Sequence, residues 1–289
     1  MIKFDYLEPT SISQAISYLK KYGEEAKVKA SGISLLLLLK DGFYSPKYLV
    51  SLLKIKGLSY IKKDADGNLA IGALTPHADI ERSSIIEKEF ISLNEMEWDL
   101  GSVQLRNRGT IGGCVCHGDP LTDPPPVLVS LGAKAKVQGP KGERIIPFSE
   151  FFVDYYETAI GHDEILTEII VPKIPKGTGC AYIKHTMRKA MDKPFVGVAA
   201  YLRLDSSKVC QEARIVLGSI SPKPIRATNL EDNLSGKKVT EELIDKQAGS
   251  YDLGDIDFTF DIRCPEYYKK WTTPAIIKRV LKIALSRAS

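Results

Sequence analysis

The sequence predicts an α+β protein with two domains, of which the second is the smaller. Helical patterns and short hairpins are mixed in residues 1–171 of the 289-residue chain, and Pro172, Pro175 and Gly177 then mark a boundary. Beyond it, three strand patterns predict an antiparallel sheet followed by two helices. No G-x-G-x-x-G sequence follows a predicted strand, which disfavours a dinucleotide-binding Rossmann domain.

Local signals place the elements of the first part. Ser11 and Gln14 form a capping box, so a helix begins there and is closed by Gly23. Turn residues and spacing then predict a strand, two hairpins and two helices. The strand is expected at residues 47–52, the hairpins at 58–73 and 133–147, and the helices at 75–81 and 85–96. Three prolines at residues 124–126 hold back the next helix until residue 127.

The C-terminal part is predicted to contain strands at residues 181–185, 196–204 and 213–217, with helices from Glu241 and from Pro274. The last helix carries cations beside an apolar stripe. We expect it to be core on one side and solvated on the other, and docking to a partner or an acidic membrane surface is the alternative.

Composition indicates a soluble enzyme or enzyme subunit. With 44% hydrophobic and 26% charged residues the chain can bury a large core, and a net charge of +4 gives no nucleic-acid footprint. The N-terminus has no apolar region of the signal-peptide type, and the longest apolar run is residues 35–39. We therefore expect no membrane span and a cytoplasmic location.

Cysteines and histidines do not form a metal-binding pattern. Of the five cysteines only Cys114 and Cys116 are close together, and one C-x-C falls short of iron–sulfur or zinc spacing. The four histidines are scattered, so we expect no metal site in this chain. We expect Cys114 and Cys116 to be small buried residues rather than thiols that line a ligand.

The most informative segment reads QLRNRGTIGGCVCHGDPLTD and ends at Asp123. Gly112 and Gly113 let the main chain approach a ligand closely, and Thr110 adds a hydroxyl donor for a phosphate oxygen. Asp119 and Asp123 suit the hydroxyl groups of a sugar or ribityl chain. The segment predicts an anionic, sugar-bearing cofactor, and a Gly/Pro-rich connection with solvated acids is the alternative.

A second loop indicates the same chemistry. Residues 27–39 read KVKASGISLLLLL, which is an extended stretch, a turn at Ser31 and Gly32, and a leucine run. A helix that follows such a turn has unpaired N–H groups that favour an anion, and Ser34 is the expected cap. Five consecutive leucines predict a helix that is buried all round.

Together the loops resemble the FAD-binding subunit of the molybdenum hydroxylases, the family of xanthine dehydrogenase and carbon monoxide dehydrogenase. That family writes the first loop approximately as A-G-G-x-S-L and the second as T-I-G-G-N-x-x-x-x-D-P-x-x-D. This chain has A-S-G-I-S-L at residues 30–35 and T-I-G-G-C at residues 110–114, followed by the two aspartates. Further matches are Leu166, in an E-I-L-x-x-I strand, and Lys184, Arg188 and Asp192, in a K-x-x-x-R-x-x-x-D segment.

The resemblance implies an FAD-binding domain of the PCMH/vanillyl-alcohol-oxidase type at residues 1–175, with lobes of about 1–55 and 56–175, and a C-terminal domain at 176–289. It also implies that the loops hold the diphosphate, that Asp123 bonds the sugar or ribityl portion, and that Leu100, Leu166 and Lys184 lie near the flavin ring. For Asp123, a helix cap is the alternative. The implied cofactor-binding residues are Lys29, Ala30, Ser31, Gly32, Ile33, Ser34, Leu35, Leu100, Thr110, Ile111, Gly112, Gly113, Cys114, Asp119, Asp123, Leu166 and Lys184.

Three of these residues depart from the family pattern. Ser31 replaces a glycine, so a positive φ there would be strained. Ile33 replaces a polar residue, and Cys114 replaces the usual asparagine. The backbone amides are unaffected, so we expect phosphate binding to persist.

The implied function is a flavoprotein subunit that relays electrons from two [2Fe–2S] clusters of a small partner through FAD to an external acceptor. A large molybdopterin-binding subunit oxidises the substrate, so no catalytic residue for that step is expected in this chain. The implied assembly is a heterotrimer or its dimer, with a partner contact of more than about 2,000 Å². The alternatives are a self-sufficient FAD oxidoreductase, for which no acid/base group stands out, and a scaffold subunit that has lost flavin.

Overall fold

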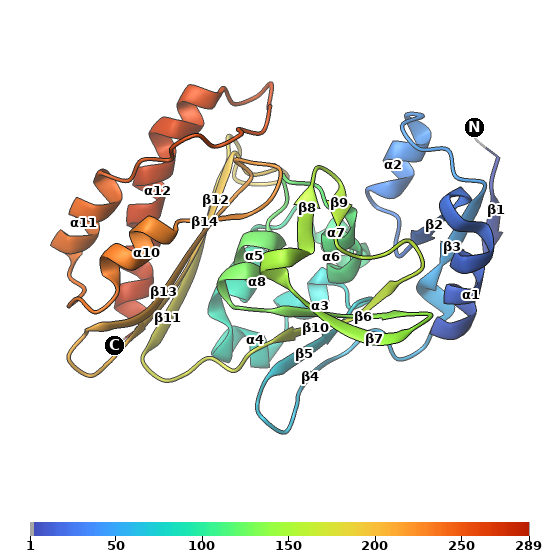
Figure 1. Ribbon diagram of the computed structural model, residues 1–289, viewed down its shortest axis with the longest axis horizontal. Helices are drawn as coiled ribbons and strands as arrows, with labels where there is room; N and C mark the ends of the chain where they lie inside the picture. Colours follow the sequence, from blue (N-terminus) through green and yellow to red (C-terminus); the bar gives the residue numbers. More distant parts are fainter. Residues whose placement is uncertain (1–2, 289) are drawn as a thin grey trace. The chain divides into compact units, whose positions relative to one another are not determined.

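The computed structural model describes residues 3–288 and contains helices and antiparallel sheets in mixed order, which confirms the α+β prediction (Figure 1). The chain forms two compact units that interleave along the sequence. Unit 1 comprises Met1–Ile80, Val103–Gly118 and Ala133–Pro172. Unit 2 comprises Glu81–Ser102, Asp119–Gly132 and Lys173–Ser289.

Unit 1 begins with a parallel sheet of three strands in the order β1–β3–β2. Helix α1 packs on this sheet, and the predicted cap at Ser11 is confirmed, although Gln14 bonds the amide of Thr10 instead of that of Ser11. The Ser11 hydroxyl accepts from the Gln14 amide at 3.2 Å, and the Gln14 side chain accepts from the Thr10 amide at 2.8 Å. The bounds are β1 (Asp5–Leu7), α1 (Ile12–Tyr22), the 3₁₀ turn η1 (Gly23–Glu25), β2 (Ala26–Lys29), α2 (Leu35–Lys40), β3 (Tyr48–Ser51) and η2 (Leu52–Lys54).

The second sheet of unit 1 is antiparallel, with the strand order β4–β5–β10–β6–β7. Both predicted hairpins are therefore present, as β4–β5 and β6–β7. Helix α7, which carries the paired glycines, lies against β10. The bounds are β4 (Ile61–Lys63), β5 (Leu69–Gly72), α3 (His77–Glu81), α6 (Val103–Arg108), α7 (Ile111–His117), β6 (Lys134–Gly139), β7 (Gly142–Pro147), α9 (Phe148–Phe151), β8 (Phe152–Asp154), β9 (Glu157–Thr158) and β10 (Ile165–Val171).

Unit 2 is built on an antiparallel sheet in the order β11–β12–β13–β14. Helices α10, α11 and α12 lie on one face of it, and α5 and α8 lie on the other (Figure 1). The bounds are α4 (Ser84–Glu89), α5 (Ile91–Asp99), α8 (Pro124–Ser130), β11 (Thr178–His185), β12 (Val196–Leu204), β13 (Cys210–Gly218), β14 (Ile225–Arg226), α10 (Thr228–Leu234), α11 (Glu241–Gly249) and α12 (Glu266–Arg287).

The core of unit 2 follows the strand alternation. Along β12, Val196, Val198 and Leu202 join the buried cluster that contains the apolar stripe of α12. The opposite side of α12 is polar, and its Lys282 pairs with Asp245 at 3.0 Å. The prediction that the last helix is core on one side and solvated on the other is confirmed.

Three helix predictions were wrong in detail. The chain is helical from Glu266, eight residues before Pro274, which therefore lies inside α12. The helical pattern at residues 85–96 is divided into α4 and α5 by Phe90, whose backbone is not helical. Helix α8 begins at Pro124 instead of after the prolines, because a proline at the first helical positions lacks only an N–H group that would have no partner there.

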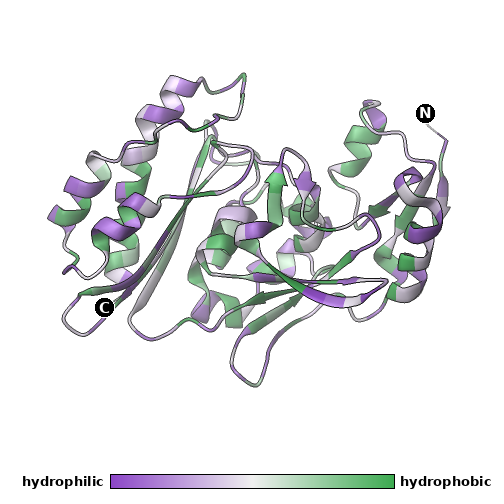
Figure 2. Cartoon of the chain, in the orientation of Figure 1, coloured by the Kyte–Doolittle hydropathy of each residue, from purple (hydrophilic) through white to green (hydrophobic). Residues whose placement is uncertain are grey.

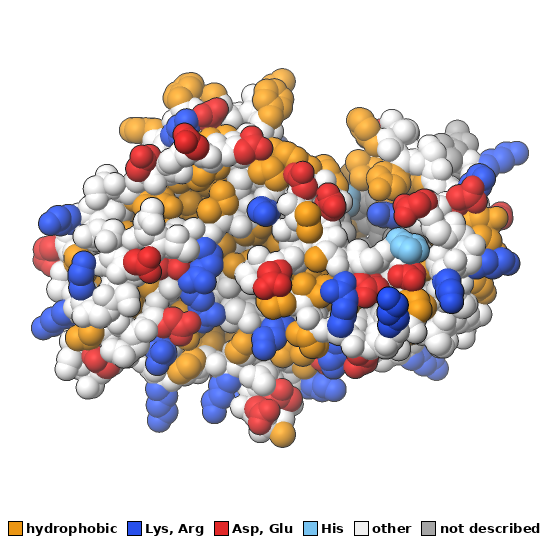
Figure 3. All heavy atoms as spheres, in the orientation of Figure 1, with side chains coloured by type: hydrophobic (Ala, Val, Ile, Leu, Met, Phe, Trp, Pro, Cys, Tyr) orange, Lys and Arg blue, Asp and Glu red, His pale blue; other side chains and the backbone are white. Residues whose placement is uncertain are grey.

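Helix α2 differs most from its prediction. It has six residues, of which only Leu39 is buried, while Leu36 and Leu37 are 43% and 59% exposed. Figure 2 colours α2 mainly as hydrophobic, and Figure 3 shows hydrophobic side chains at the surface there. The leucine run therefore forms a short helix with one buried side chain, and the expectation that it is buried all round was wrong.

Among residues 3–288 no helix is both long and apolar enough to cross a membrane.

Candidate functional site

The first predicted loop connects the end of β2 to α2 in unit 1. Gly32 has a φ of +85°, and a Cβ placed on it would lie 3.0 Å from Cε of Lys29. Ser31 is not among the described residues with positive φ. The strain expected at Ser31 is therefore absent, because the neighbouring glycine adopts the left-handed conformation.

The backbone amides of this loop are the available donors of the site. Within residues 3–288, the N–H groups of residues 31–35 make no hydrogen bond to another residue. Lys29, which is 8% exposed, donates from Nζ to the Ala30 carbonyl at 3.1 Å and to the Tyr6 hydroxyl at 3.3 Å. Five N–H groups and a held ammonium group form a local environment that favours an anion.

Ser34 does not cap α2, so that prediction was wrong. It occupies the N-cap position, but its φ and ψ of −85° and −42° are helical, and its side chain makes no capping hydrogen bond. A capping residue normally has extended backbone angles, which let its side chain turn back to the amides.

The second predicted loop forms the first turn of helix α7. The Thr110 hydroxyl caps the helix and accepts from the Gly113 amide at 3.2 Å. The next amides have partners too: Ile111 donates to the Thr75 carbonyl at 3.1 Å, Gly112 to the Ala73 carbonyl at 2.9 Å, and Cys114 to the Thr110 carbonyl at 2.9 Å. In contrast with the first loop, these N–H groups already have protein acceptors.

The paired glycines have different surroundings. A Cβ on Gly112 would overlap the Ala73 carbonyl oxygen, which is backbone. A Cβ on Gly113 would lie 2.8 Å from the Thr110 hydroxyl oxygen and 3.2 Å from Cβ of Ala30. Since Ala30 belongs to the first loop, the structure brings the two loops side by side within unit 1.

The two nearby thiols are more accessible than expected. Cys114 is partly buried and Cys116 is exposed, so the expectation that both are buried was wrong. Helix α7 has only seven residues and packs through Ile111, Gly112 and Val115, which leaves the side that carries Cys116 open. Among residues 3–288, no group of three His, Cys, Asp or Glu side chains is arranged to hold a metal ion.

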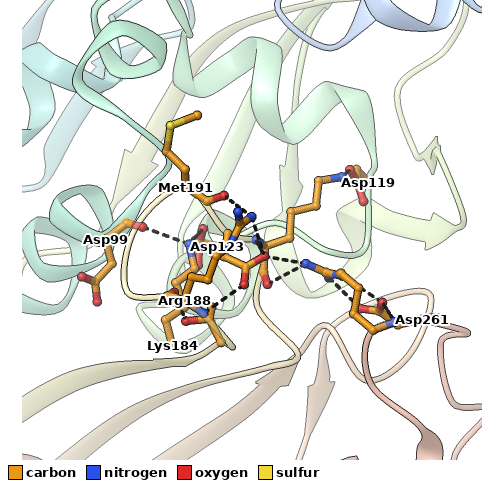
Figure 4. A network of polar contacts seen from close by, with 11 residues as sticks. Asp99, Asp119, Asp123, Lys184, Arg188, Met191 and Asp261 are labelled. Carbon is orange, nitrogen blue, oxygen red and sulfur yellow. Dashed lines mark hydrogen bonds and ion pairs between the residues drawn. The ribbon is translucent and has the colours of Figure 1, made fainter.

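The two predicted carboxylates belong to unit 2, where both are buried and engaged (Figure 4). Asp119 accepts from the Leu121 amide at 2.9 Å and pairs with Lys193. Asp123 accepts from the Tyr182 hydroxyl at 2.8 Å and from Nζ of Lys184 at 2.9 Å.

Asp123 precedes α8 but makes no capping hydrogen bond, so the alternative role as a helix cap was wrong. Lys184 also donates to the Asp99 carbonyl at 2.9 Å, which fixes its ammonium group. Burial raises the pKa of Asp123, and the positive charge and hydrogen bond of Lys184 oppose that rise. Burial and the neighbouring Asp123 raise the pKa of Tyr182 well above its ordinary value, so the Tyr182 hydroxyl keeps its proton and remains a donor.

Two further predicted residues are apolar and buried. Leu100 is the C-cap residue of α5 in unit 2, and Leu166 lies in β10 of unit 1 next to a break in strand register. Sequence reasoning missed Tyr182 and Lys193. Tyr182 could have been found, because it lies two residues before Lys184 and so on the same face of the strand. Lys193 follows no motif.

Replacement of Gly32 by alanine is expected to distort the donor loop. A side chain at φ +85° costs about 1–2 kcal/mol, and the new Cβ would press on Lys29. Relief of this strain would rotate the amides of residues 31–35, so anion affinity should fall together with stability. Denaturant unfolding and FAD titration measure the two effects, and an unchanged FAD affinity would contradict a role for this loop.

Nearly the whole chain matches known protein families. Residues 2–174 match the model of the FAD binding domain in molybdopterin dehydrogenase, and residues 181–284 match the CO dehydrogenase flavoprotein C-terminal domain. The chain is 32% identical over 287 residues to the carbon monoxide dehydrogenase medium chain of Hydrogenophaga pseudoflava, with 99% of each chain covered. It is 33% identical over 285 residues to subunit alpha of the 6-hydroxypseudooxynicotine dehydrogenase complex of Paenarthrobacter nicotinovorans, covering 99% and 95%.

A solved structure gives a similar result. The carbon monoxide dehydrogenase from Hydrogenophaga pseudoflava that lacks the Mo-pyranopterin moiety superposes with a TM-score of 0.94 at 32% identity, and all of both chains is covered.

Proposed function

Because the chain belongs to the FAD-binding subunits of the molybdenum hydroxylase family, we propose that its two loops in unit 1 hold the FAD diphosphate. FAD accepts electrons one at a time and passes on one or two, which suits a relay between iron–sulfur clusters and an external acceptor. The function of this chain's own residues is therefore to bind and orient the cofactor.

One observation carries the assignment of the diphosphate. The amides of residues 31–35 have no protein acceptor among residues 3–288, although they lie beside Lys29 and close to the Thr110 turn. A diphosphate supplies several acceptor oxygens and the negative charge that such a group of N–H donors favours. The departures at Ser31, Ile33 and Cys114 leave these amides in place.

In keeping with the sequence resemblance, the same proposal assigns the sugar or ribityl portion of FAD to Asp119 and Asp123. An ionised carboxylate has about four acceptor positions, and Asp123 uses one for Tyr182 and one for Lys184. It therefore keeps capacity for a cofactor hydroxyl, and so does Asp119. Leu100, Leu166 and Lys184 are assigned to the surroundings of the flavin ring.

The partners are proposed to be a large molybdopterin-binding subunit and a small subunit with two [2Fe–2S] clusters, in a cytoplasmic heterotrimer or its dimer. Support comes from the relatives, which are named as a medium chain and as a subunit of a dehydrogenase complex. We propose that residues 1–175 form the FAD-binding domain and residues 176–289 the C-terminal domain, in keeping with the two family models.

We expect the chain to copurify with a large and a small subunit and to contain one FAD per chain. The measurements are subunit composition by mass spectrometry and the absorption spectrum of oxidised flavin. A flavin-free chain in an intact complex would indicate the scaffold role. A chain that oxidises an aldehyde or heterocycle by itself with an artificial acceptor would indicate a self-sufficient oxidoreductase.

A further inference from the structure

The connection between β11 and β12 enters the core of unit 2 at its C-terminal end, where Phe195 is buried. Residues 186–195 form no helix or strand, and they are closed at their base by a hydrogen bond from the Phe195 amide to the His185 carbonyl at 2.8 Å. Met187 and Met191 are exposed, and Met191 has a φ of +53°. Apolar burial therefore fixes the connection at Phe195, and polar contacts fix the part around Asp192.

Asp192 is the centre of those contacts. Its side chain is 5% exposed and accepts from the Arg188 amide at 3.2 Å and from the Lys193 amide at 3.1 Å. A third donor, the Arg263 guanidinium, reaches it at 2.7 Å from the segment that precedes α12. A buried carboxylate with three donors fixes the backbone on both sides of itself.

Asp261 orients the Arg263 side chain that contacts Asp192. Two of its nitrogens donate to the two carboxylate oxygens of Asp261 at 2.9 and 2.6 Å. Its guanidinium also lies 5.1 Å from the centre of the Phe195 ring, at the end of the connection. Arg263, oriented by Asp261, therefore contacts the connection at Asp192, at the Lys193 carbonyl, to which it donates at 3.4 Å, and at the Phe195 ring.

The connection also carries the partner of a proposed cofactor residue. Lys193, the residue after Asp192, pairs with Asp119 (Figure 4). The Lys193 side chain is half-exposed, and an exposed lysine with a free backbone contributes little through an ion pair. Anchoring its backbone through Asp192 reduces the entropy lost when the pair forms. A continuous path within unit 2 thus joins Arg263 to Asp119 across 144 residues of sequence (263 − 119).

We propose that Arg263 is a positioning residue for FAD: through Asp192 it fixes the connection, and it thereby keeps Lys193 on Asp119. This inference rests on the proposed function, in which Asp119 belongs to the cofactor site. Arg263 does not need to touch the cofactor, and it lies outside every motif that the sequence offers for FAD.

The test is FAD titration of the deflavinated intact complex, with the visible circular dichroism of the bound flavin as a second readout. Arg263→Ala is expected to weaken FAD binding about tenfold and to change the flavin dichroism. Lys193→Ala should do the same. Because Arg263 and Lys193 both act through the contact of Lys193 with Asp119, the double variant should lose no more FAD affinity than the single variant that binds FAD more weakly.

Two further variants make the result specific. Arg263→Lys keeps the charge without the planar fork, so it should recover part of the affinity, and it serves as the test if the alanine variant does not fold. Arg203→Ala removes an arginine whose pair with Glu212, at 3.5 Å, is more exposed, and it should bind FAD as the wild type does.

Wild-type FAD affinity in Arg263→Ala would overturn the inference. If that variant does not fold, wild-type affinity in both Arg263→Lys and Lys193→Ala would overturn it. Additive losses of affinity in the double variant would overturn it too. These outcomes leave the proposed function intact. A wild-type complex that binds no FAD would overturn the proposed function and this inference with it.

Discussion

Replacement of Gly113 by valine is expected to remove FAD from the protein. The first added carbon would lie 2.8 Å from the Thr110 hydroxyl oxygen and 3.2 Å from Cβ of Ala30, and the branched methyl groups would extend further. The new side chain would therefore stand between the two loops assigned to the diphosphate. Loss of several charge-assisted hydrogen bonds predicts a fall in FAD affinity of at least about 100-fold.

Neighbouring Gly112 should behave differently, although the two residues are adjacent in the same motif. Its Cβ would overlap the backbone oxygen of Ala73, which cannot move without shifting the end of β5. Gly112→Ala is therefore expected to destabilise the fold by about 2–4 kcal/mol. Gly249→Ala is the matched control: a Cβ there meets nothing within 4 Å, so both stability and FAD content should remain close to wild type.

Flavin content, measured by absorbance after gel filtration, and denaturant midpoints of the apoprotein separate these effects. Full FAD content in Gly113→Val would refute the placement of the diphosphate. Equal losses of stability in the Gly112 and Gly113 variants would show instead that both glycines serve packing.

The elements predicted well were those whose signal is local. The Ser11 cap of α1 and the strand at residues 196–204 each depend on residues that lie within one turn or one strand. The leucine run of α2 gave a wrong prediction, because hydrophobicity shows that side chains could be buried but does not show which neighbours cover them. The start of the last helix was wrongly predicted at Pro274 for a related reason. Packing of α12 against the sheet outweighs the one backbone hydrogen bond that a proline inside the helix removes.

The candidate site divides in the same way. The Thr110 cap and the close approach at the paired glycines could be predicted from sequence, because capping and close backbone approach require particular residue types at fixed spacing. The pairing of Lys193 with Asp119 and the contact of Arg263 with Asp192 could not be found, because these partners are 74 and 71 residues apart. Their approach depends on how β11, β12 and the segment before α12 are arranged.

Asp123→Ala is expected to be the most destabilising single change in the polar network of unit 2. The Asp123 and Lys184 side chains are 7% and 6% exposed, so removal of the carboxylate leaves a buried ammonium group whose remaining acceptor among residues 3–288 is the Asp99 carbonyl. It also leaves the Tyr182 hydroxyl without its acceptor. Removing one partner of a buried ion pair costs about 3–5 kcal/mol, which denaturant unfolding of the apoprotein measures.

Two variants test the physical reason for that loss. Tyr182→Phe removes only one neutral donor and should cost about 1 kcal/mol. Glu25→Ala breaks the exposed pair with Lys47 and should leave the unfolding midpoint almost unchanged. If Asp123→Ala unfolded at the wild-type denaturant concentration, the buried pair would not be what holds α8 to β11.

The same variant tests the role of Asp123 toward the cofactor. If a cofactor hydroxyl uses the free acceptor positions of Asp123, FAD binding to the folded fraction should weaken by about 1–3 kcal/mol. Titration of the variant with FAD in the absence of denaturant, corrected for the folded fraction, isolates this change in affinity. Lower stability with unchanged FAD affinity would assign Asp123 to the buried ion pair alone and would leave Asp119 as the carboxylate that meets the sugar.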